Sequence, residues 1–369
     1  MEGKKIIISH GWSDFSLNYQ SKYLSVEWSK KNKVLFLDNK KKHQGIVHVS
    51  QNLQVMEWPG NRPVGWKDFV FAFKTLKQFK PDIVISNFAS NDILMWVSWI
   101  LKVENRICYY HTMVQQHLED YGHLSYRQRF NVFRKGLAFR KATHLLASSH
   151  AAKNDLVKYY RTNPEKVFVF PNIIEDSQER NPGEPNRIGF LGRLDKSKGV
   201  DILINAFYKL NTYFPHVQLL IAGKGVEEAN LKKMADELGI RDQIVFAGSI
   251  SGNEVRHFLA SLHFLVVPSR MDNLPTVALE ALSTATPVIG SNRGGIPDII
   301  HDGYNGLLFE NEHSDSLFEK MQMVLKHEIE WRDLSRNARI SYEERFSPKT
   351  LLPRFQRLFN KDSNVNFSK

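Results

Sequence analysis

The stretch "HFLVVPSRMDNLPTVALEALSTATPVIGS" (His263–Ser291) indicates the fold most directly. It begins with one short apolar run, HFLVVPS, and ends with another, PVIGS, and the helical pattern PTVALEAL lies between them. Apolar runs of this length, bounded by turn residues, are typical of buried parallel strands, and a helix between two of them completes a βαβ unit. This stretch therefore predicts a parallel sheet covered by helices.

The same alternation of apolar runs and helical patterns extends over the whole chain of 369 residues. In the first half we expect strands at Lys4–Ser9, Lys33–Asp38, Asp82–Ser86, Arg106–His111, His144–Ser149 and Lys166–Asn172. In the second half we expect them at Arg187–Gly192, Val217–Gly223, Gln243–Gly248, His263–Ser269, Pro287–Ser291 and Gly306–Phe309. This pattern predicts the α/β class, with one doubly wound, Rossmann-like parallel sheet per half and the two sheets facing each other across a cleft.

The chain is too long for one ordinary core, so two domains are expected. The polar segment PNIIEDSQERNPGEPNR (Pro171–Arg187) clusters Pro and Gly, as linkers do. We therefore expect one domain over residues 1–173 and a second domain over residues 174–344. A basic, aromatic C-terminal helix over about residues 345–369 is expected to join the first domain.

The composition predicts a soluble globular protein, with 42% hydrophobic and 24% charged residues. Cys108 is the single cysteine, which excludes an intrachain disulfide and fits a reducing cytoplasm. The longest apolar stretch, Asp92–Val103, is shorter than the roughly 20 residues that a spanning helix needs. We expect no transmembrane segment and no signal peptide, and a cytoplasmic location, peripheral at the inner face of the plasma membrane.

The net charge of +11 is unevenly distributed along the chain. Residues 1–173 hold 26 Lys and Arg against 13 Asp and Glu, whereas residues 174–369 hold 24 against 26. This excess indicates an anionic partner of the first half, such as nucleic acid, anionic lipid or a phosphorylated acceptor, or else a solvated basic surface.

One segment of the first half, Ser125–Leu146, combines basic and apolar residues at helical spacing. It places Arg127, Arg129, Arg134, Lys135, Arg140 and Lys141 among Phe130, Phe133, Leu137 and Phe139. The pattern predicts a basic amphipathic helix. Either the helix lies on an anionic membrane surface, or it faces the core and its basic side is solvated.

The loop GRLDKSKG (Gly192–Gly199) follows a predicted strand and precedes a helix that begins near Val200. Backbone amides at a helix start carry partial positive charge, and Arg193 and Lys198 add two cations beside them. Arg binds two phosphate oxygens at once and Lys acts as a point charge, so this loop could bind a diphosphate. An ordinary basic surface loop is the alternative interpretation.

Two carboxylates flank the start of the helix within the opening stretch. Asp272 precedes the helix, and Pro275 suits its first turn because proline needs no donor there. Glu280 lies in the second turn, roughly 8 Å along the axis from Leu274. The two carboxylates can accept hydrogen bonds from two separate hydroxyl-bearing parts of one ligand, as in the hexose and ribose of a nucleotide sugar. A capping Asp and a surface Glu are the alternative.

GRLDKSKG, followed by PSRMDNLPTVALEALSTATPVIGSNRGGIPDIIHDGYNGLLF, resembles the donor half of retaining GT-B glycosyltransferases of glycosyltransferase family 4. The resemblance covers most of Arg187–Phe309, and it implies that residues 1–173 form the acceptor-binding domain and residues 174–344 the nucleotide-sugar donor-binding domain. The first half resembles the family more loosely, through its sheet pattern, the loop after its first strand and YYHTM. The resemblance implies transfer of a hexose-type sugar from a nucleotide-diphosphate sugar to a saccharide acceptor, and a UDP-sugar is the expected donor. A lipid-linked acceptor in cell-surface polysaccharide synthesis is expected.

The resemblance also implies roles for residues of the second half. Arg193 and Lys198 match the pair that binds the donor diphosphate. Asp272 matches the first acid of the family's paired-acid motif, near the sugar hydroxyls, and Glu280 matches the second, at the ribose. The remaining matches are the amides of Asn273 and Leu274, at the sugar and phosphate, and Gly248 and Ile250, in the loop that lines the base.

In the first half, His111 matches a family histidine that faces the transferred sugar. Without the resemblance, a hydrogen-bonded histidine at a strand end would be the simpler interpretation. Gly11 matches the glycine loop that lets phosphate or acceptor approach the backbone closely. His111, Arg193, Lys198 and Asp272 are the catalytic candidates.

The sequence departs from the family at four positions. Asp272 replaces Glu and reaches one methylene less far, which affects sugar selectivity. Gly11 stands alone where relatives often have two glycines. Ala285 takes a position usually held by Gly, and if that site is a left-handed helix cap, Ala costs about 1 kcal/mol. Asp298 replaces a usual Glu.

No metal and no cofactor are expected, because the histidines show no paired spacing with cysteine and no DxD motif stands out. We expect same-face attack by an acceptor hydroxyl, with the leaving diphosphate held by Arg193 and Lys198 taking the proton. The alternatives are a GT-B epimerase or phosphorylase, a nucleic-acid glucosyltransferase, and a non-catalytic nucleotide-sugar-binding protein. No nucleic-acid partner is expected, because no such binding signature is present.

Overall fold

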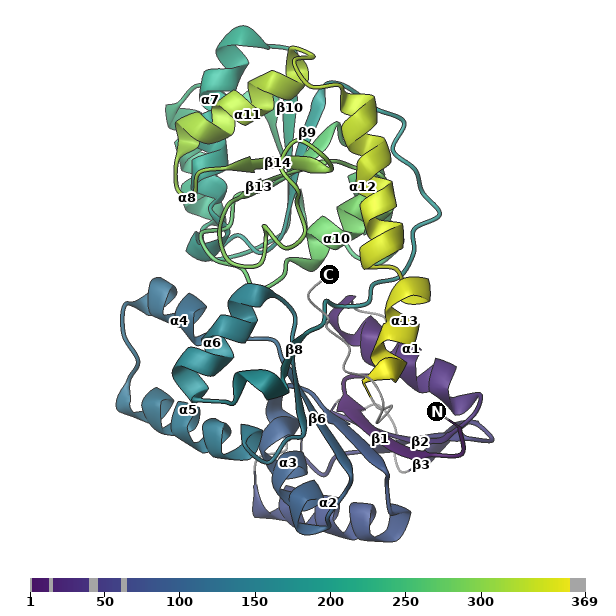
Figure 1. Ribbon diagram of the computed structural model, residues 1–369. Coiled ribbons are helices and arrows are strands. Elements are labelled where there is room, and N and C mark those ends of the chain that lie inside the picture. Colours follow the sequence, from purple (N-terminus) through teal and green to yellow (C-terminus); the bar gives the residue numbers. More distant parts are fainter. Residues whose placement is uncertain (1, 13–15, 40–45, 61–64, 359–369) are drawn as a thin grey trace. The chain divides into compact units, whose positions relative to one another are not determined.

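The computed structural model describes residues 2–12, 16–39, 46–60 and 65–358. The chain divides into two compact units (Figure 1). The first unit comprises Met1–Ile173 and Leu351–Lys369, and the second comprises Ile174–Thr350. Each unit has its own sheet and its own hydrophobic core, so each is described separately.

The first unit contains an eight-stranded sheet with the order β3-β4-β2-β1-β5-β6-β7-β8. Its strands are β1 (Lys5–His10), β2 (Lys33–Asp38), β3 (Ile46–Ser50), β4 (Leu53–Glu57), β5 (Ile83–Ser86), β6 (Asn105–Tyr110), β7 (His144–Ala147) and β8 (Val167–Val169). The six expected strands of this half are confirmed. The hairpin of β3 and β4 was not expected. Because β3 is an edge strand, exposed along most of its length and antiparallel to β4, it lacks the apolar run of a buried strand.

Helices cover the sheet of the first unit. They are α1 (Ser16–Ser29), α2 (Trp66–Phe79), α3 (Asn91–Ile100), α4 (Val114–Tyr121), α5 (Tyr126–Phe139) and α6 (His150–Tyr160), with short 3₁₀ turns η1 (Phe88–Ser90) and η2 (Pro164–Lys166). Side chains fix several helix starts: Ser125 and Gln128 form a capping box at α5, and Ser149 caps α6.

The C-terminal segment differs from the expected single helix over about residues 345–369. The second unit's last long helix, α12 (Trp331–Arg345), ends at Arg345, and α13 (Pro348–Arg357) follows it. Within α13, Leu351 and Phe355 are buried in the core of the first unit, where the Phe355 ring lies 5.2 Å from that of Trp28. Residues 359–369 lie outside the described residues.

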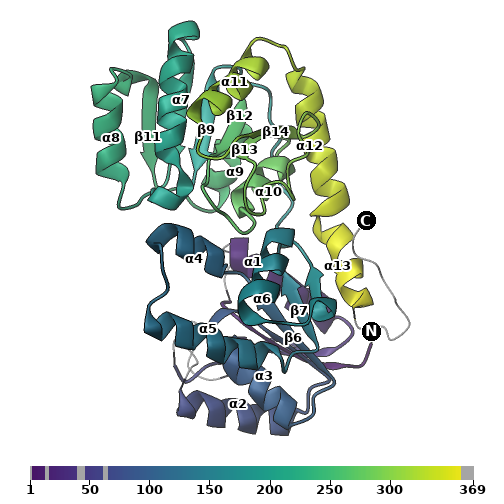
Figure 2. The same ribbon diagram turned by 60° about the vertical axis from the view of Figure 1, so that its left-hand side comes forward.

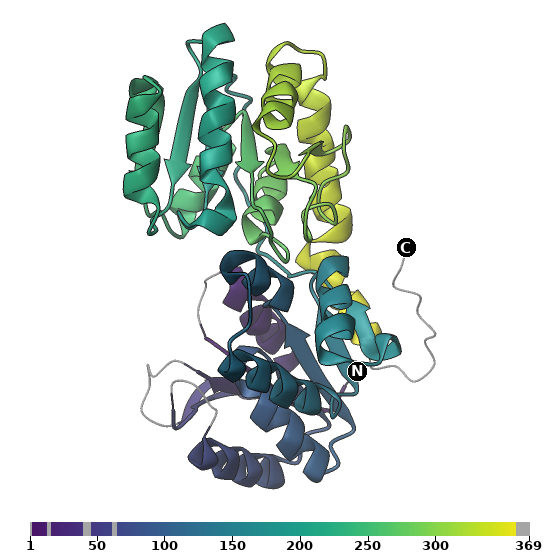
Figure 3. The same cartoon turned by 90° about the vertical axis from the view of Figure 1, so that its left-hand side faces the viewer.

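The second unit contains a fully parallel six-stranded sheet with the order β11-β10-β9-β12-β13-β14, as expected. Its strands are β9 (Arg187–Leu191), β10 (Gln218–Ala222), β11 (Ile244–Gly248), β12 (Phe264–Val267), β13 (Val288–Ser291) and β14 (Gly306–Phe309). The helices besides α12 are α7 (Val200–Tyr213), α8 (Glu228–Glu237), α9 (Asn253–Ala260), α10 (Thr276–Ser283) and α11 (Ser314–Leu325), with 3₁₀ turns η3 (Lys196–Lys198) and η4 (Arg241–Gln243). Two core clusters place α7, α8 and α11 on one face and α9 and α10 on the other (Figures 2 and 3).

The strand order creates one topological switch point in each sheet. In the first unit the chain runs from β1 to β2 on one side and later places β5 on the other. In the second unit it runs from β9 to β10 and later places β12 on the opposite side of β9. Ligands of such sheets bind beyond the carboxyl ends of the strands at this point. The loops after β1, β5, β9 and β12 are therefore the places to inspect.

Candidate functional site

The loop between β9 and α7 is held against the end of β12 by a glycine. Gly199 adopts φ +66°, and a Cβ there would lie 2.1 Å from the Pro268 carbonyl oxygen. Neither a left-handed backbone nor so close an approach suits another residue. The preceding turn η3 therefore lies at the switch point of the second sheet, and Lys198 is its last residue.

Lys198 and Asp272, which the sequence predicts as separate parts of the site, are brought together. Lys198 Nζ lies 2.5 Å from Asp272 Oδ2, and the side chains are only 18% and 13% exposed. One comes from the loop after β9 and the other from the loop after β12. The pair places a cation and a carboxylate side by side at the carboxyl edge of the sheet.

Arg193, the other predicted cation, is held differently. Its side chain is 71% exposed, and its guanidinium pairs with Asp195 at 2.9 Å. Solvent therefore screens Arg193 far more than it screens Lys198.

Arg270 is a residue of this region that the sequence did not reveal. Its guanidinium donates two hydrogen bonds to the Asp201 carboxylate, at 2.9 and 2.7 Å, and one to the Lys196 carbonyl at 2.6 Å. The pair with Asp201 raises the pKa of Arg270. The backbone N–H of Arg270 also donates to the Ser197 carbonyl at 2.9 Å. Arg270 thus fixes η3, and with it the backbone that carries Lys198.

The glycine pair after β13 supports Asp272 from the other side. Gly294 adopts φ +64°, and a Cβ there would lie 2.1 Å from the Asp272 carbonyl oxygen. The Gly295 N–H donates to the same oxygen at 2.9 Å. Asn273 and Leu274, whose amides the resemblance assigns to the ligand, follow with 6% and 5% exposure. The segment is therefore positioned by its backbone rather than by exposed side chains.

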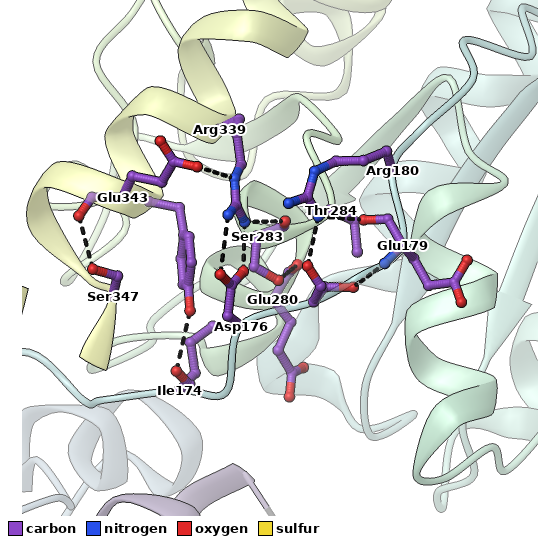
Figure 4. A network of polar contacts seen from close by, with 12 residues as sticks. Ile174, Asp176, Glu179, Arg180, Glu280, Ser283, Thr284, Arg339, Glu343 and Ser347 are labelled. Atoms are coloured by element: carbon purple, nitrogen blue, oxygen red, sulfur yellow. Dashed lines mark hydrogen bonds and ion pairs between the residues drawn. The ribbon is translucent and has the colours of Figure 1, made fainter. Parts of the chain in front are cut away.

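Helix α10 begins at Thr276, so Pro275 is its N-cap rather than its first helical residue. In the first turn the Ala278 N–H donates to the carbonyl of the N-cap Pro275 at 3.1 Å, and the N–H groups before it precede any acceptor within the helix. Glu280 lies in the second turn and is partly exposed. Figure 4 shows its carboxylate turned away from the pair of Arg339 and Asp176.

The other end of α10 is anchored to the chain that enters the second unit. Arg339 of α12 donates to the Ser283 carbonyl at 2.8 Å and binds the Asp176 carboxylate at 2.6 and 3.1 Å (Figure 4). The Asn181 N–H donates to the Thr284 carbonyl at 2.9 Å. These contacts fix the helix that carries Glu280.

Ala285 meets the condition stated for it above, that its site is a left-handed helix cap. Its φ is +62°, in the left-handed region, directly after the last turn of α10. The Thr286 N–H donates to the Ala281 carbonyl at 2.8 Å, which closes the helix end as in a Schellman motif. Glycine is the residue that this backbone favours.

Gly248 and Ile250 follow β11 at the same carboxyl edge of the second sheet. Gly248 adopts φ +69°, and its carbonyl accepts a hydrogen bond from the Gly223 N–H at 2.6 Å. Ile250 is partly exposed. Because β10 separates β11 from β9, this loop lies on the flank of the Lys198 and Asp272 region.

His111 and Gly11 belong to the first unit, at the carboxyl ends of β6 and β1. The His111 Nε2 lies 2.9 Å from Asn87 Oδ1, and burial lowers the pKa of the ring to about 4. Its ring stacks on Phe88 at 4.5 Å. Gly11 is buried, and a Cβ there would lie 3.1 Å from Asn18 Nδ2. Asn87 and Phe88 carried no sequence signal.

Within the described ranges, no group of three or more His, Cys, Asp or Glu side chains is arranged to hold a metal ion. No helix in the part of the chain that the structure describes is both long and apolar enough to cross a membrane.

Two family models match the chain. "Glycosyl transferases group 1" matches residues 171–341, and "Glycosyltransferase Family 4" matches residues 34–178. The chain is 27% identical over 193 residues to the phosphatidylinositol N-acetylglucosaminyltransferase gpi3 subunit of Schizosaccharomyces pombe, covering 50% of this chain and 42% of that protein. It is 29% identical over 214 residues to the D-inositol 3-phosphate glycosyltransferase of Frankia alni, covering 52% of each. The chain thus spans about half the length of these curated relatives.

Solved structures show the same fold over nearly the whole chain. The sucrose-phosphate synthase of Thermosynechococcus elongatus matches with a TM-score of 0.77 and 18% identity, covering 96% of this chain and 98% of that one. Anabaena HepE in complex with UDP and glucose matches with a TM-score of 0.77 and 16% identity, covering 96% and 99%. The two parallel-sheet units therefore form a GT-B fold. The two family models together extend over residues 34–341, so the chain is similar to glycosyltransferases over that range.

Proposed function

We propose that the protein is a retaining glycosyltransferase that moves a hexose-type sugar from a UDP-sugar to a saccharide acceptor without a metal ion. The observation that carries the proposal is the pair of Lys198 and Asp272 at the switch point of the second sheet. A largely buried cation beside a carboxylate suits a ligand that carries both phosphate and hydroxyl groups. HepE, which has the same fold, was solved with UDP-glucose.

In this proposal Lys198, Arg193 and the first turn of α10 hold the donor diphosphate. Asp272 accepts hydrogen bonds from the sugar hydroxyls, and Glu280 accepts them from the ribose. Asp272 is one methylene shorter than the family's Glu, so it favours a sugar whose hydroxyl lies closer to the loop.

The transfer step needs no group beyond the two substrates and these residues. The bond between the sugar C1 and the β-phosphate oxygen breaks, and the acceptor oxygen bonds to C1 on the same face. The acceptor proton passes to the leaving phosphate oxygen. Lys198 and Arg193 stabilise the charge that develops on the diphosphate, and such electrostatic stabilisation is usually the largest contribution to catalysis.

Calorimetric titration of UDP tests the donor site. We expect saturable binding that weakens at least tenfold in Glu280→Ala, because the ribose then lacks its acceptor. Glu237→Ala, on an exposed helix surface of the same unit, is the matched control and should bind as the wild type does. Equal UDP affinity of Glu280→Ala and the wild type would reject the assignment.

We further propose a lipid-linked acceptor in cell-surface polysaccharide assembly, with the enzyme in the cytoplasm, peripheral at an anionic membrane. Support comes from the outward face of α5, where Tyr126, Phe130 and Phe133 are 91%, 63% and 62% exposed. The sequence pattern grouped Phe139 with Phe130 and Phe133. That grouping is wrong, because Phe139 is buried and packs inward. The exposed aromatic rings alternate with Arg127 and Arg129, a combination typical of membrane-surface helices.

Sedimentation with vesicles that contain phosphatidylglycerol tests this placement. The wild type should co-sediment at low salt, and the triple variant Tyr126→Ser, Phe130→Ser, Phe133→Ser should not. The control is Tyr213→Ser, which removes an exposed aromatic of the second unit. Equal sedimentation of the triple variant and the wild type, or none by the wild type, would contradict the proposed membrane surface.

A further inference from the structure

Arg270 connects three segments at the carboxyl edge of the second sheet. It follows β12, and its side chain is 20% exposed. The guanidinium donates to both carboxylate oxygens of Asp201 in α7, at 2.9 and 2.7 Å, and to the Lys196 carbonyl of η3 at 2.6 Å. Its Nε donates to Glu312, which follows β14, at 2.8 Å. One side chain therefore joins the segments that follow β9, β12 and β14.

These contacts use most of the hydrogen-bonding capacity of Arg270. A guanidinium has five N–H donors, and four of them are used in the hydrogen bonds to Asp201, Lys196 and Glu312. Two carboxylates also compensate its charge. A phosphate ligand needs free donors and an uncompensated charge. Arg270 therefore suits a role in holding other residues rather than in binding an anion.

The backbone that Arg270 holds is the one that carries Lys198. The Arg270 N–H donates to the Ser197 carbonyl at 2.9 Å, and its guanidinium donates to the preceding carbonyl, that of Lys196. Two successive carbonyls of η3 are therefore bound to Arg270, and Lys198 is the next residue. A shift of η3 would move the lysine with it.

The same turn also reaches the other cation of the loop. The Ser197 hydroxyl donates to Asp195 Oδ1 at 2.6 Å, and Asp195 Oδ2 pairs with Arg193 at 2.9 Å. The positions of both cations therefore depend on η3, Lys198 directly and Arg193 through Asp195.

We propose that Arg270 is a positioning residue that, paired with Asp201, holds η3 so that Lys198 meets the donor diphosphate, and that Arg270 does not bind the diphosphate itself. The hold on η3 rests only on contacts within the second unit. The diphosphate as the ligand rests on the proposed function.

Hydrogen–deuterium exchange of the ligand-free protein, followed by mass spectrometry, tests the hold on η3. The Lys198 N–H donates to the Asp195 carbonyl at 3.0 Å, so its exchange reports opening of the turn. Peptides that cover residues 192–203 should exchange about tenfold faster in Arg270→Gln than in the wild type, because charge-assisted hydrogen bonds are lost. Peptides from α8 should exchange as before.

The matched control for this experiment is Arg241→Gln. Arg241 lies in η4, another 3₁₀ turn of the second unit, and also donates to a backbone carbonyl, that of Ile244 at 2.9 Å. The control should leave the exchange of residues 192–203 unchanged. Unchanged exchange in Arg270→Gln would overturn the inference. Equal acceleration throughout the second unit would also overturn it, because that result would show only a general loss of stability.

Asp201→Asn distinguishes positioning from direct binding, with UDP affinity measured by calorimetric titration. The substitution keeps the size of the side chain and removes a charge partner of Arg270. If Arg270 positions η3, UDP affinity should fall about tenfold, as when a residue that orients a ligand-binding group loses its partner. Unchanged affinity would overturn the inference. Increased affinity would also overturn it, because Arg270, once released, would then bind the diphosphate.

A double-mutant cycle of Arg270→Gln and Lys198→Gln gives a second measure of the same distinction. Lys198→Gln should weaken UDP binding less in the Arg270→Gln background than in the wild type, because Lys198 no longer meets the diphosphate there. Two independent ligands of the diphosphate would give additive losses, and additive losses would contradict the positioning role. If the wild type binds no UDP, the proposed function fails, whereas the exchange experiment still decides whether Arg270 holds η3.

Discussion

Lys198→Gln is the substitution that most directly probes the second-unit site. The lysine side chain is 18% exposed, so its charge acts through a medium of low effective dielectric. A unit charge 4 Å from a phosphate charge contributes about 4 kcal/mol at an effective dielectric constant of 20. Loss of one such stabilising group typically lowers turnover by about 10²–10³-fold, which is the same order. We expect kcat to fall by that factor.

Arg193→Gln should have a smaller effect, although the family resemblance implies the same role for both cations. Arg193 is 71% exposed. In surroundings close to bulk water, the same charge pair contributes only about 1 kcal/mol, or roughly fivefold in rate. The assay is UDP release from the nucleotide sugar that binds best, measured for both variants and the wild type under the same salt conditions.

Two controls separate loss of charge from damage to the loop. Lys196→Gln removes an exposed lysine from the same 3₁₀ turn and should leave turnover unchanged. Lys198→Gln combined with Asp272→Asn removes the unpaired carboxylate, so it should recover stability but not turnover. Near-wild-type turnover of Lys198→Gln, or a larger loss in Arg193→Gln, would refute this reasoning.

Three further predictions concern stability, each measured by urea unfolding. Ala285→Gly should raise the free energy of unfolding by up to about 1 kcal/mol, because φ +62° disfavours a Cβ. No change, or a loss, would contradict that explanation. Gly199→Ala should lower the free energy of unfolding by more than backbone strain alone, which costs about 1–2 kcal/mol, because the new Cβ would also clash with the Pro268 carbonyl oxygen. The control is Gly303→Ala, which has positive φ but open space around it, and equal losses would show that the close contact is unimportant. His263 is 3% exposed, and burial lowers its pKa to about 4. Between pH 4 and 6.5 the unfolded chain therefore binds more protons than the folded protein does. The free energy of unfolding should fall as the pH drops through that window. His263→Phe should flatten this part of the pH dependence, and an unchanged slope would reject the assignment.

The sequence predicted the buried strands well because each is a short apolar run that stands out from its polar surroundings. It also placed α10 and the loops that carry Lys198 and Asp272, since turn residues and strand ends are local features. The left-handed conformation at Ala285 was considered only because the family usually has Gly at that position, and the structure shows φ +62° there.

Contacts between distant segments were not predictable in this way. The Arg270 guanidinium binds the carboxylate of Asp201, 69 residues away, and no residue near Arg270 in the sequence indicates that pair. Asn87 connects Ser9 to His111 only after three strands have assembled. The inward side of Phe139 was missed because periodicity does not show which face of a helix meets the core.

Thermal unfolding with a panel of UDP, GDP, ADP and their common sugar conjugates tests the central claim most directly. A ligand that binds only the folded state stabilises it by about 2.7 kcal/mol at 100 times its dissociation constant. We predict a clear rise in the unfolding temperature with UDP or a UDP-sugar, and loss of that rise in Lys198→Gln. No rise with any nucleotide would contradict the proposed donor site.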